Sequence, residues 1–320
     1  MSRVLIVANG NTGNLSPFVR EQMSALQLIG VEVVAYGIVG KGLMGYLRNV
    51  KEIRKTIHEF NPDIIHAHYG LSGLCANLQR QVPVITTYHG SDIHSGGWVL
   101  KLSQLAMRLS AYNVFVSQRL LAMSGCKRKE TAVIPCGVTL DRMSVTDREQ
   151  AKQQLGRNRS FVLFAGAFDN VIKNAALAKE AMLLLEGVDL VELSGYTRHE
   201  VNVLMNAADC LLMTSLREGS PQVIKEAMAC GTPVVSVDVG DVKEVIGNTE
   251  GCYIAERNPA DIAAKIKMAL AFKGKTNGRQ RIIELGLSND VVAKRLVEVY
   301  EEISRTTLKS QMTTLFKMDI

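Results

Sequence analysis

The sequence predicts an α/β protein built from two Rossmann-like halves, each with a parallel sheet. Short runs rich in β-branched residues alternate with helical patterns along the chain, which is typical of strands joined by crossover helices. This alternation occurs in two series, and the polar stretch Thr139–Arg159 separates them. A length of 320 residues also fits two domains. We therefore expect a ligand in a cleft between the halves, at the carboxyl ends of the strands.

The first series contains six strand-like runs with helical stretches between them. The runs are Val4–Ala8, Val31–Tyr36, Asp63–Ala67, Val84–Tyr88, Asn113–Ser117 and Thr131–Pro135, and the helical stretches include Pro17–Ile29, Leu43–Phe60 and Trp98–Ser110.

The second series contains four strand-like runs and is followed by a capped amphipathic helix over Ser288–Arg305. The runs are Phe161–Ala165, Asp189–Ser194, Cys210–Thr214 and Pro233–Asp238. We accordingly assign residues 1–150 to an N-terminal domain, 151–290 to a C-terminal domain and 291–320 to a terminal helix.

The composition excludes several classes of protein. An apolar content of 47% is ample for buried cores, so the chain is not disordered. The six cysteines form no Cys-x-x-Cys pair and lack the spacing of metal sites. No apolar run approaches the ~18 residues of a membrane span, and the N-terminus has no secretory signal pattern. We expect a cytoplasmic protein with reduced thiols.

The positive charge lies entirely in the first half. Residues 1–150 contain 16 Lys and Arg against 10 Asp and Glu, whereas residues 151–320 contain 21 of each. This bias suggests an anionic partner such as a membrane surface, a nucleic acid or an acidic substrate. In Leu43–Phe60, three cations on one flank (Arg48, Lys51 and Lys55) could meet lipid head groups on the inner face of the membrane. A helix packed on the core with a solvated polar face is the alternative.

Two glutamates eight positions apart enclose the predicted start of a helix in Glu218-Gly219-Ser220-Pro221-Gln-Val-Ile-Lys-Glu226. Ser220 is a favoured N-cap type, and Pro221 suits the first helical position. Glu218 then lies in the loop beside free N–H groups that attract anions, with Glu226 two turns inside the helix. This arrangement suits a ligand with hydroxyls and phosphates, such as a sugar nucleotide.

This segment, with the Gly-Thr-Pro-Val-Val and Gly240-Asp241-x-x-Glu244 that follow it, resembles the donor site of glycosyltransferase family 4. The members of that family are retaining enzymes with the GT-B fold. The resemblance implies that Glu218 contacts the donor sugar and that Glu226 binds the ribose. The alternative is an ordinary strand-loop-helix unit with two surface glutamates.

Two loops of the first half extend the resemblance. The first strand ends in Asn-Gly-Asn-Thr-Gly13-Asn before a helix, and glycines there let the backbone approach a ligand. In the family this loop faces the donor diphosphate, which makes Gly13 a candidate. His89-Gly-Ser-Asp also follows a strand and resembles the family's His-Gly-x-Asp, so we assign His89 to orienting the sugar. His66 and His68 end the preceding strand and are interpreted as core or loop histidines, with a place on the acceptor side as the alternative.

The second half opens with a partial match to the family's diphosphate site. The family has Gly-Arg followed by Lys-Gly, and Lys173 matches the lysine. Ala167 and Phe168 occupy the place of the arginine, so one expected cation is missing. Another basic side chain or helix N–H groups must replace it, or donor turnover is weakened. A solvated lysine at a helix start is the alternative for Lys173.

Weaker matches connect these motifs along the chain. Val-Ile-Pro-Cys136-Gly-Val resembles the family's link between domains, and Ala-Ala-Asp209 precedes the strand before Glu218. The terminal helix looks like the GT-B helix that crosses back to the first domain.

The resemblance thus implies a retaining hexosyltransferase that moves a sugar from a nucleotide diphosphate to a hydroxyl of a sugar or lipid-linked acceptor, with UDP as the nucleotide that the family suggests. Glu218, Lys173 and His89 are the expected catalytic residues, and Gly13, Gly219, Ser220, Pro221 and Glu226 are expected to bind the donor. With no Asp-x-Asp sequence, we expect no divalent metal and no other cofactor. A GT-B sugar-nucleotide epimerase and a weakened nucleotide-sugar-binding protein are the alternatives. A nucleic-acid partner is not expected, because no reader motif is present.

Overall fold

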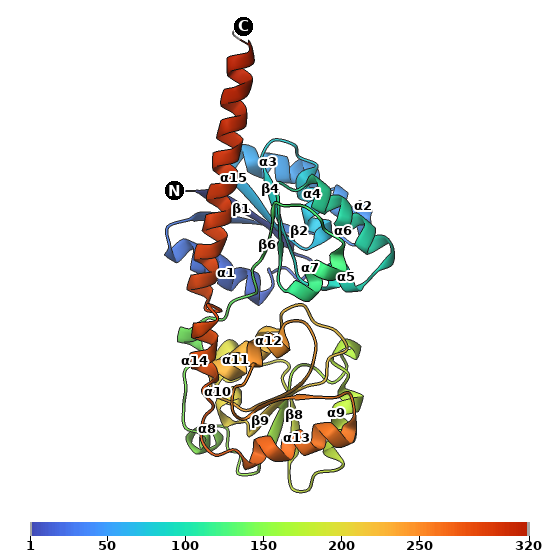
Figure 1. Cartoon of the computed structure of the whole chain (residues 1–320), viewed down its shortest axis with the longest axis vertical. Helices are drawn as coiled ribbons and strands as arrows, with labels where there is room; N and C mark the ends of the chain where they lie inside the picture. Colours follow the sequence, from blue (N-terminus) through green and yellow to red (C-terminus); the bar gives the residue numbers. More distant parts are fainter. Residues whose placement is uncertain (1, 319–320) are drawn as a thin grey trace. The chain divides into compact units, whose positions relative to one another are not determined.

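The computed structural model describes residues 2–318 and the side chains of residues 2–306. The chain divides into two compact units (Figure 1). Unit 1 contains residues 1–135 and 289–320, and unit 2 contains residues 136–288. The boundary therefore lies at Pro135–Cys136 and not at 150/151 as expected. Residues after Cys136 belong to unit 2 because α8 (Arg148–Gln154) packs on α10 (Arg198–Ala207).

Unit 1 is built on a six-stranded parallel sheet in the order β2-β1-β3-β4-β5-β6. The strands β3 and β4 are buried along their whole length, as expected of a parallel sheet covered on both faces. The strands are β1 (Arg3–Asn9), β2 (Glu32–Ile38), β3 (Ile64–His68), β4 (Val84–Tyr88), β5 (Tyr112–Phe115) and β6 (Thr131–Val133). The helices are α1 (Pro17–Leu28), α2 (Gly42–Leu47), α3 (Val50–Phe60), α4 (Gly70–Asn77), α5 (Ser91–His94), α6 (Gly97–Leu109), α7 (Gln118–Ser124) and α15 (Asn289–Met318).

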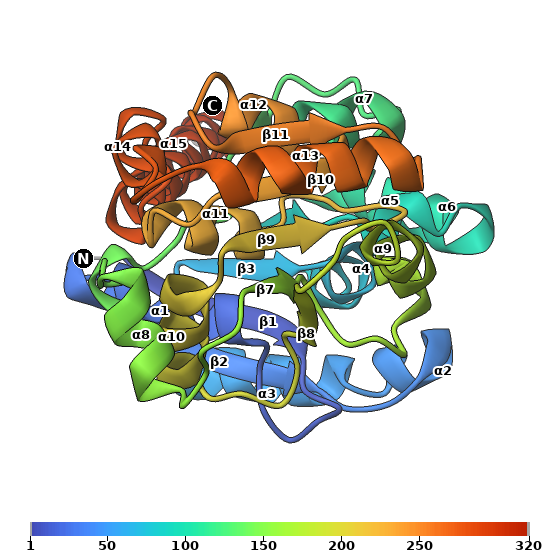
Figure 2. The same cartoon turned by 90° about the horizontal axis from the view of Figure 1, so that it is seen from below.

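Unit 2 has a five-stranded sheet in the order β11-β10-β9-β7-β8, and α13 runs along β10 and β11 (Figure 2). Its strands are β7 (Phe161–Phe164), β8 (Asp189–Glu192), β9 (Cys210–Met213), β10 (Val234–Val237) and β11 (Cys252–Ala255). Its helices are η1 (Leu140–Arg142), α8, η2 (Val171–Lys173), α9 (Ala175–Met182), α10, α11 (Gln222–Ala229), α12 (Val242–Ile246), α13 (Pro259–Ala271) and α14 (Gly278–Glu284). The edge strand β11 was not predicted, because a four-residue strand carries little pattern.

The predicted helix over Leu43–Phe60 is wrong in one respect, since it is two helices. Asn49 lies between them, and its buried amide donates to the carbonyl oxygens of Val39 and Gly45 at 3.0 and 2.7 Å. Its Oδ1 also accepts from the hydroxyl of Tyr36 at 2.9 Å. A side chain that bonds the backbone in this way competes with continuous helix formation.

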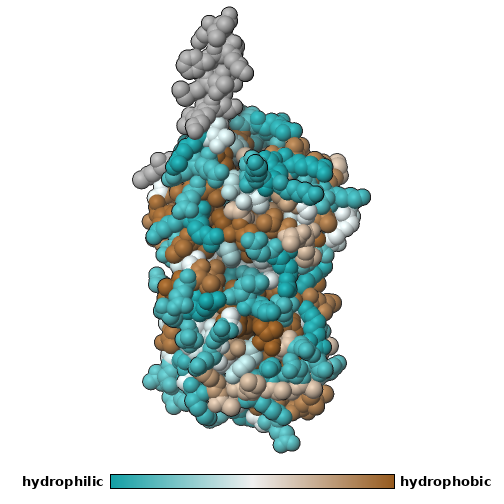
Figure 3. Space-filling view, in the orientation of Figure 1, coloured by the Kyte–Doolittle hydropathy of each residue, from teal (hydrophilic) through white to brown (hydrophobic). Residues whose placement is uncertain are grey.

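The apolar face of α3 packs into the core of unit 1. Ile53, Ile57 and Phe60 are buried there against Leu5 and Val7 of β1. Of the two interpretations of this helix, the core-packed one is therefore confirmed. On the face of unit 1 seen in Figure 3, hydrophobic and hydrophilic residues are interspersed. Among residues 2–318, no helix has both the length and the hydropathy that crossing a bilayer requires.

The terminal helix α15 returns to unit 1, as the resemblance implied. Its apolar side chains share one buried cluster with β1 and α1, and the strip Val292, Leu296, Val299 and Ile303 lies against that cluster. Because α15 follows unit 2 in the chain, the core of unit 1 closes only when both ends of the sequence are present. The α/β class, the two Rossmann-like halves and this crossing helix are confirmed.

Helix α4 is buried on all sides because glycines let it approach its neighbours closely. A Cβ on Gly73 would lie 2.4 Å from the Oγ1 of Thr86 in β4. We predict that Gly73→Ala lowers the free energy of unfolding of unit 1 by about 1–3 kcal/mol, because overpacking forces backbone shifts. Urea unfolding followed by the fluorescence of Trp98, the single tryptophan, measures this change. Ser24→Ala, on the exposed face of α1, is the control and should change stability by less than about 0.5 kcal/mol. An unchanged Gly73→Ala midpoint would contradict the packing argument.

Candidate active site

In unit 2, Lys173 and Glu218 form a direct ion pair. Lys173 ends η2 after β7, and Glu218 follows β9, the neighbouring strand. The distance from Lys173 Nζ to Glu218 Oε1 is 2.7 Å, and the two side chains are 23% and 17% exposed. The strand order reverses between β7 and β9, and ligands of open α/β sheets bind at such switch points. Two residues predicted from separate motifs are thus in contact at the place where a ligand is expected.

The backbone beside Lys173 leaves room for its side chain. Gly166 has a φ of +153°, and a Cβ there would lie 2.8 Å from Lys173 Cγ. The expected arginine position is filled by an aromatic cluster in which Phe168 packs on Phe164, with ring centroids 5.4 Å apart. The ammonium of Lys179 lies 4.7 Å from the centre of the Phe168 ring. A cation is therefore present beside this position, although it comes from α9.

The predicted helix start after Glu218 is wrong by one position. Helix α11 begins at Gln222, Pro221 is its N-cap, and no side chain caps it. Ser220 instead donates its hydroxyl hydrogen to Asp241 Oδ2 at 2.5 Å. Lys225 Nζ donates to the same hydroxyl oxygen at 2.5 Å. The hydroxyl of Ser220 thus serves this polar network and not the helix end.

Lys225 is the centre of this network. Its side chain is 0% exposed, and its Nζ lies 2.8 Å from the carbonyl oxygen of Cys136 and 3.3 Å from Asp241 Oδ2. Lys225 therefore ties the loop before α11 to the first residue of unit 2. Lys225 and Asp241 both lie within the motifs of the donor segment, but no role was predicted for either. The available signal was a lysine within two positions of three apolar residues, Val223, Ile224 and Ala227, because a lysine among apolar residues is rarely buried without a partner.

Glu226 lies in the interior of unit 2. Its side chain is 7% exposed, and its Oε1 lies 2.8 Å from Nη2 of Arg198, the first residue of α10. Neither Glu226 nor Glu218 is a surface side chain, so the alternative of two surface glutamates is wrong. The backbone of Gly219 packs closely against Gly240, because a Cβ on Gly240 would lie 2.6 Å from the carbonyl oxygen of Gly219. The segment from Glu218 to Glu226 is thus fixed on several sides.

In unit 1, Gly13 occupies the exposed turn that follows β1. Its φ is +79°, and its N–H donates to the carbonyl oxygen of Gly10 at 3.0 Å. Glycine adopts this backbone conformation without a steric penalty. The turn lies at the carboxyl end of the sheet, where β3 and β4 also end.

Three histidines from β3 and the end of β4 form a stack at this edge. His68 Nδ1 and His89 Nε2 lie 2.9 Å apart, and the rings of His66 and His68 stack with centroids 4.7 Å apart. His66 bonds the hydroxyls of Tyr300 in α15 and Thr87, each at 2.7 Å. The interpretation of His66 as a core histidine is confirmed. His68 supports His89 directly, a role that spacing alone did not indicate.

Burial keeps these histidines uncharged. It lowers the pKa of His68 to about 3, and it lowers the pKa of His66 and His89 well below the usual value. The pairing of His68 and His89 in one hydrogen bond also requires one ring to donate and the other to accept. Neutral His89 can therefore orient a hydroxyl-bearing ligand without bringing a positive charge.

Asp92 lies beside this stack, and no role was predicted for it. Its carboxylate is buried and accepts backbone N–H groups from Gly70, His89 and Gly90 at 3.2, 3.3 and 2.8 Å. Burial raises its pKa to about 6, although these hydrogen bonds act in the opposite direction. Its place as the last residue of the quoted His-Gly-Ser-Asp motif was the signal.

The predicted site residues thus fall into two groups. The structure brings Glu218 and Lys173 together in unit 2, with Gly219, Ser220, Pro221 and Glu226 in the same segment. His89 and Gly13 lie in unit 1. Within residues 2–306, no group of three or more His, Cys, Asp or Glu side chains is arranged to hold a metal ion.

The neutral histidines predict that unit 1 becomes less stable as pH falls below about 6.5. An unfolded chain takes up protons there, while folded His68, with a pKa of about 3, does not. Each such histidine costs up to about 1.4 kcal/mol per pH unit. Asp92 acts oppositely between its unfolded value of 3.8 and about 6, but it offsets only one histidine. Urea unfolding at several pH values, followed by Trp98 fluorescence, measures the slope. His68→Phe should reduce the slope and exposed His58→Gln should not, whereas a flat profile from about pH 7 to 5 would contradict the assignment.

The buried network predicts a large effect of removing its cation. Lys225→Met leaves the carboxylate of Asp241 buried without its ion-pair partner, and we expect a loss of about 3–5 kcal/mol in the free energy of unfolding. Adding Asp241→Asn should recover part of that loss, because it removes the stranded charge. Denaturant unfolding of unit 2 by circular dichroism measures both. Lys243→Met, on the exposed side of α12, is the matched control, and an equal effect there would contradict the network's importance.

Several proteins of known sequence that resemble this chain are named as glycosyltransferases. A D-inositol 3-phosphate glycosyltransferase of Geodermatophilus obscurus is 29% identical over 267 residues, covering 65% of this chain and 59% of that protein. A putative teichuronic acid biosynthesis glycosyltransferase, TuaC of Bacillus subtilis, is 26% identical over 254 residues, covering 68% and 64%. The chain thus spans about three fifths of the length of these curated relatives.

Solved structures share the fold at low identity. Sucrose-phosphate synthase from Thermosynechococcus elongatus superposes with a TM-score of 0.82 at 16% identity, covering 96% of this chain and 100% of that chain. HepE of Anabaena, solved with UDP and glucose, superposes with a TM-score of 0.67 at 17% identity, covering 97% of this chain and 100% of that chain. A UDP-GlcNAc 2-epimerase of Methanocaldococcus jannaschii superposes with a TM-score of 0.60 at 14% identity, covering 94% of this chain and 100% of that chain. The fold is therefore GT-B, and the fold alone is shared by transferases and an epimerase.

Two sequence families match the two halves in order. Residues 3–142 match Glycosyltransferase Family 4, and residues 149–271 match Glycosyl transferases group 1. The two matches cover different halves, and the fold agrees with both. The chain is thus a glycosyltransferase whose first half matches Glycosyltransferase Family 4 and whose second half matches Glycosyl transferases group 1.

Proposed function

We propose that this protein transfers a sugar from a nucleotide-diphosphate donor to an acceptor hydroxyl in the assembly of a cell-envelope polysaccharide or glycolipid. The observation that carries the proposal is the contact of Lys173 with Glu218 at the switch point of unit 2, beside the start of α11. The names of the relatives support the kind of product. The resemblance to family 4 supports transfer with retention of the anomeric configuration and a UDP-linked donor.

Each residue of the segment has a role in this proposal. Glu218 accepts hydrogen bonds from hydroxyls of the donor sugar. Glu226 accepts hydrogen bonds from the two hydroxyls of the ribose. Lys173 and the backbone N–H groups of Gly219 and Ser220, just before α11, stabilise the departing diphosphate. A fixed lysine is well suited to this work, since it is a compact point charge held beside a carboxylate.

Unit 1 supplies the orienting groups in the proposal. Neutral His89 positions the donor sugar, and the Gly13 turn offers its backbone to the diphosphate. The leaving phosphate oxygen accepts the proton of the acceptor, so no separate protein base is required. The reaction uses no divalent metal, and transfer should therefore survive a chelator.

An anionic membrane surface is a further partner in the proposal. The excess of Lys and Arg in residues 1–150 supports it. The apolar face of α3 does not contribute, because it is buried in the core of unit 1.

The test separates donor binding from transfer. Glu226→Ala should weaken nucleotide binding by about 10- to 100-fold, because hydrogen bonds to a charged acceptor contribute about 1.5–3 kcal/mol. Glu218→Ala should lower transfer and leave affinity for the free nucleotide unchanged. Thermal shifts against a panel of nucleotide sugars identify the donor first, since a bound donor stabilises the folded state. Calorimetry with UDP and product analysis then measure the two effects.

Glu186→Ala, an exposed glutamate after α9, is the matched control for both variants. Unchanged nucleotide affinity in Glu226→Ala would contradict the ribose assignment. Product NMR with an inverted anomeric centre would contradict retention.

A nucleotide-sugar-binding protein without turnover is the second candidate. The observation that favours it is Phe168 in place of the diphosphate arginine, with its N–H bonded to Glu192 at 2.7 Å. Donor binding without product across a broad acceptor panel would select it. Incubation of donor alone, with an epimerised sugar as the product, would instead select an epimerase.

A further inference from the structure

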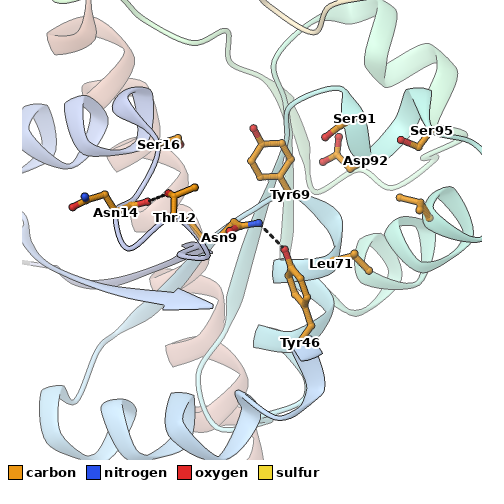
Figure 4. A pocket seen from close by; sticks show the side chains of 12 residues that line it. Asn9, Thr12, Asn14, Ser16, Tyr46, Tyr69, Leu71, Ser91, Asp92 and Ser95 are labelled. Carbon is orange, nitrogen blue, oxygen red and sulfur yellow. Dashed lines mark hydrogen bonds between the residues drawn. The ribbon is translucent and has the colours of Figure 1, made fainter. Parts of the chain in front are cut away.

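The cavity of unit 1 in Figure 4 belongs to the candidate active site. Its volume is about 440 Å³, and its lining includes Thr12 of the turn after β1 and Asp92 beside the histidine stack. The ring of Tyr69 lies between these two groups and contacts the ring of His89, with centroids 4.7 Å apart. This cavity is therefore part of the site already described.

Another cavity, of about 400 Å³, lies in unit 2 at the edge of the sheet opposite to that site. Ser160 and Asp209 line it, and they directly precede β7 and β9. Lys173 and Glu218 instead follow the carboxyl ends of the same two strands. Because β7 and β9 are parallel, the length of both strands separates the cavity from the candidate donor site. Its described lining contains none of the predicted site residues.

Three cations that are at least partly buried line this cavity in the described part of unit 2. Arg148 and Lys152 come from α8, with side chains 16% and 8% exposed, and Lys275 follows α13. One buried carboxylate faces them, since Asp209 Oδ1 lies 3.0 Å from Lys152 Nζ and 3.5 Å from Arg148 Nη1. Positive charge therefore exceeds negative charge inside the cavity by two. Buried charge of one sign costs free energy unless a counter-charge joins it.

Lys275 is the cation of this group that lacks a carboxylate partner. Its Nζ donates to the carbonyl oxygen and the Oδ1 of Asn206 at 3.1 and 3.0 Å, and both of these acceptors are neutral. Burial lowers the pKa of Lys275 to about 8, and the positive charge of Arg148 acts in the same direction. A bound anion would oppose both effects, because it favours the charged form of the lysine.

Several N–H donors of the lining also lack an acceptor. The Nε of Arg148 is buried without a hydrogen-bond partner among the described residues, while its Nη2 donates to the carbonyl oxygen of Gly274 at 3.1 Å. The ammonium of Lys152 has three N–H donors and makes one hydrogen bond within the described chain, to Asp209. Buried donors are nearly always paired with protein, water or a ligand. The oxygens of an anion would supply the missing acceptors.

The exposed part of the lining limits the size of such an anion. Asp147 and Glu149 are exposed, so negative charge lies where the cavity meets solvent, and exposed Lys273 offsets only one of them. A polyanion that extended out of the cavity would meet this negative charge. Leu270 and Phe272 give the lining an apolar part. A small anion, alone or with a compact organic body, therefore fits better than a polymer.

We propose that this cavity binds a phosphate dianion, either free or carried by a small phosphomonoester. Its oxygens accept hydrogen bonds from Arg148, Lys152 and Lys275, and the organic part of an ester contacts Leu270 and Phe272. A phosphate matches the excess charge, because it carries about −1.5 to −2 near pH 7 and has three strong acceptor oxygens. The inference does not rest on the proposed function, which concerns the opposite edge of the sheet.

The first experiment compares anions of similar shape and different charge. Phenyl phosphate, phenyl sulfate and inorganic phosphate are titrated into the full chain by calorimetry at about pH 7.5, where a phosphate monoester is mainly dianionic. Phenyl phosphate should bind about tenfold or more tightly than phenyl sulfate, its monoanionic analogue. Tighter binding of phenyl phosphate than of inorganic phosphate identifies an ester as the ligand, and otherwise free phosphate is the ligand. No binding of either phosphate, or equal binding of the sulfate, would overturn the proposal.

Two pairs of variants test where the anion binds. Lys275→Met should weaken phenyl phosphate about tenfold or more, whereas Lys267→Met, exposed on α13 and outside the lining, should not change it. Ser160→Asp adds a carboxylate to the lining and should weaken binding by a similar factor, while Ser160→Asn, of the same shape but neutral, should retain it. Circular dichroism checks the fold of each variant, and the Ser160 pair decides the matter if Lys275→Met does not fold. Equal effects within a folded pair would overturn the assignment of the cavity.

Lys173→Met distinguishes this cavity from the candidate active site, where a phosphate could also bind. It should lower affinity for UDP and leave phenyl phosphate binding unchanged. Loss of phenyl phosphate binding in Lys173→Met, with retention in Lys275→Met, would place the anion in the active site; it would overturn the inference and leave the proposed function standing. Phosphate binding that depends on Lys275, in a protein that binds no nucleotide sugar, would overturn the function and leave the inference standing.

Discussion

The parallel pairing of strands at two switch points is the constraint on which both candidate sites depend. In unit 1, β1 pairs with β2 on one side and β3 on the other, and in unit 2, β7 pairs with β8 and β9 in the same way. Parallel register brings the carboxyl ends of neighbouring strands to one edge. Loops that are far apart in the sequence therefore meet there, and the contact of Lys173 with Glu218 is a direct result.

The two sites differ in the chemistry that this constraint assembles. In unit 2 the edge carries a partly buried ion pair and a second carboxylate, Glu226, held by Arg198. In unit 1 it carries neutral histidines, the aromatic ring of Tyr69 and one carboxylate, Asp92. The division of polar chemistry between the units supports the proposed transfer.

Residues far from the reacting groups determine how firmly these sites are built. Tyr300 of the terminal helix bonds His66, which stacks on His68, and His68 in turn bonds His89. In unit 2, Lys225 fixes the loop before α11 through Ser220 and the carbonyl oxygen of Cys136. Both networks are buried, so each polar group must find a partner within the fold. Positioning of the candidate site residues is thus a property of the whole unit.

The sequence by itself determined the α/β class, the two halves, the amphipathic terminal helix and the segment from Glu218 to Glu226, whereas the return of that helix to unit 1 was implied by the family resemblance. Those features depend on local periodicity and on motifs within a few residues, which a single sequence displays. It did not determine the break at Asn49, the helix start at Gln222 or the roles of Lys225 and Asp92. In each of these cases a side chain bonds a group distant in the sequence, and that bond decides the outcome. Only the tertiary structure brings such partners together, because local propensities do not encode which strands become neighbours.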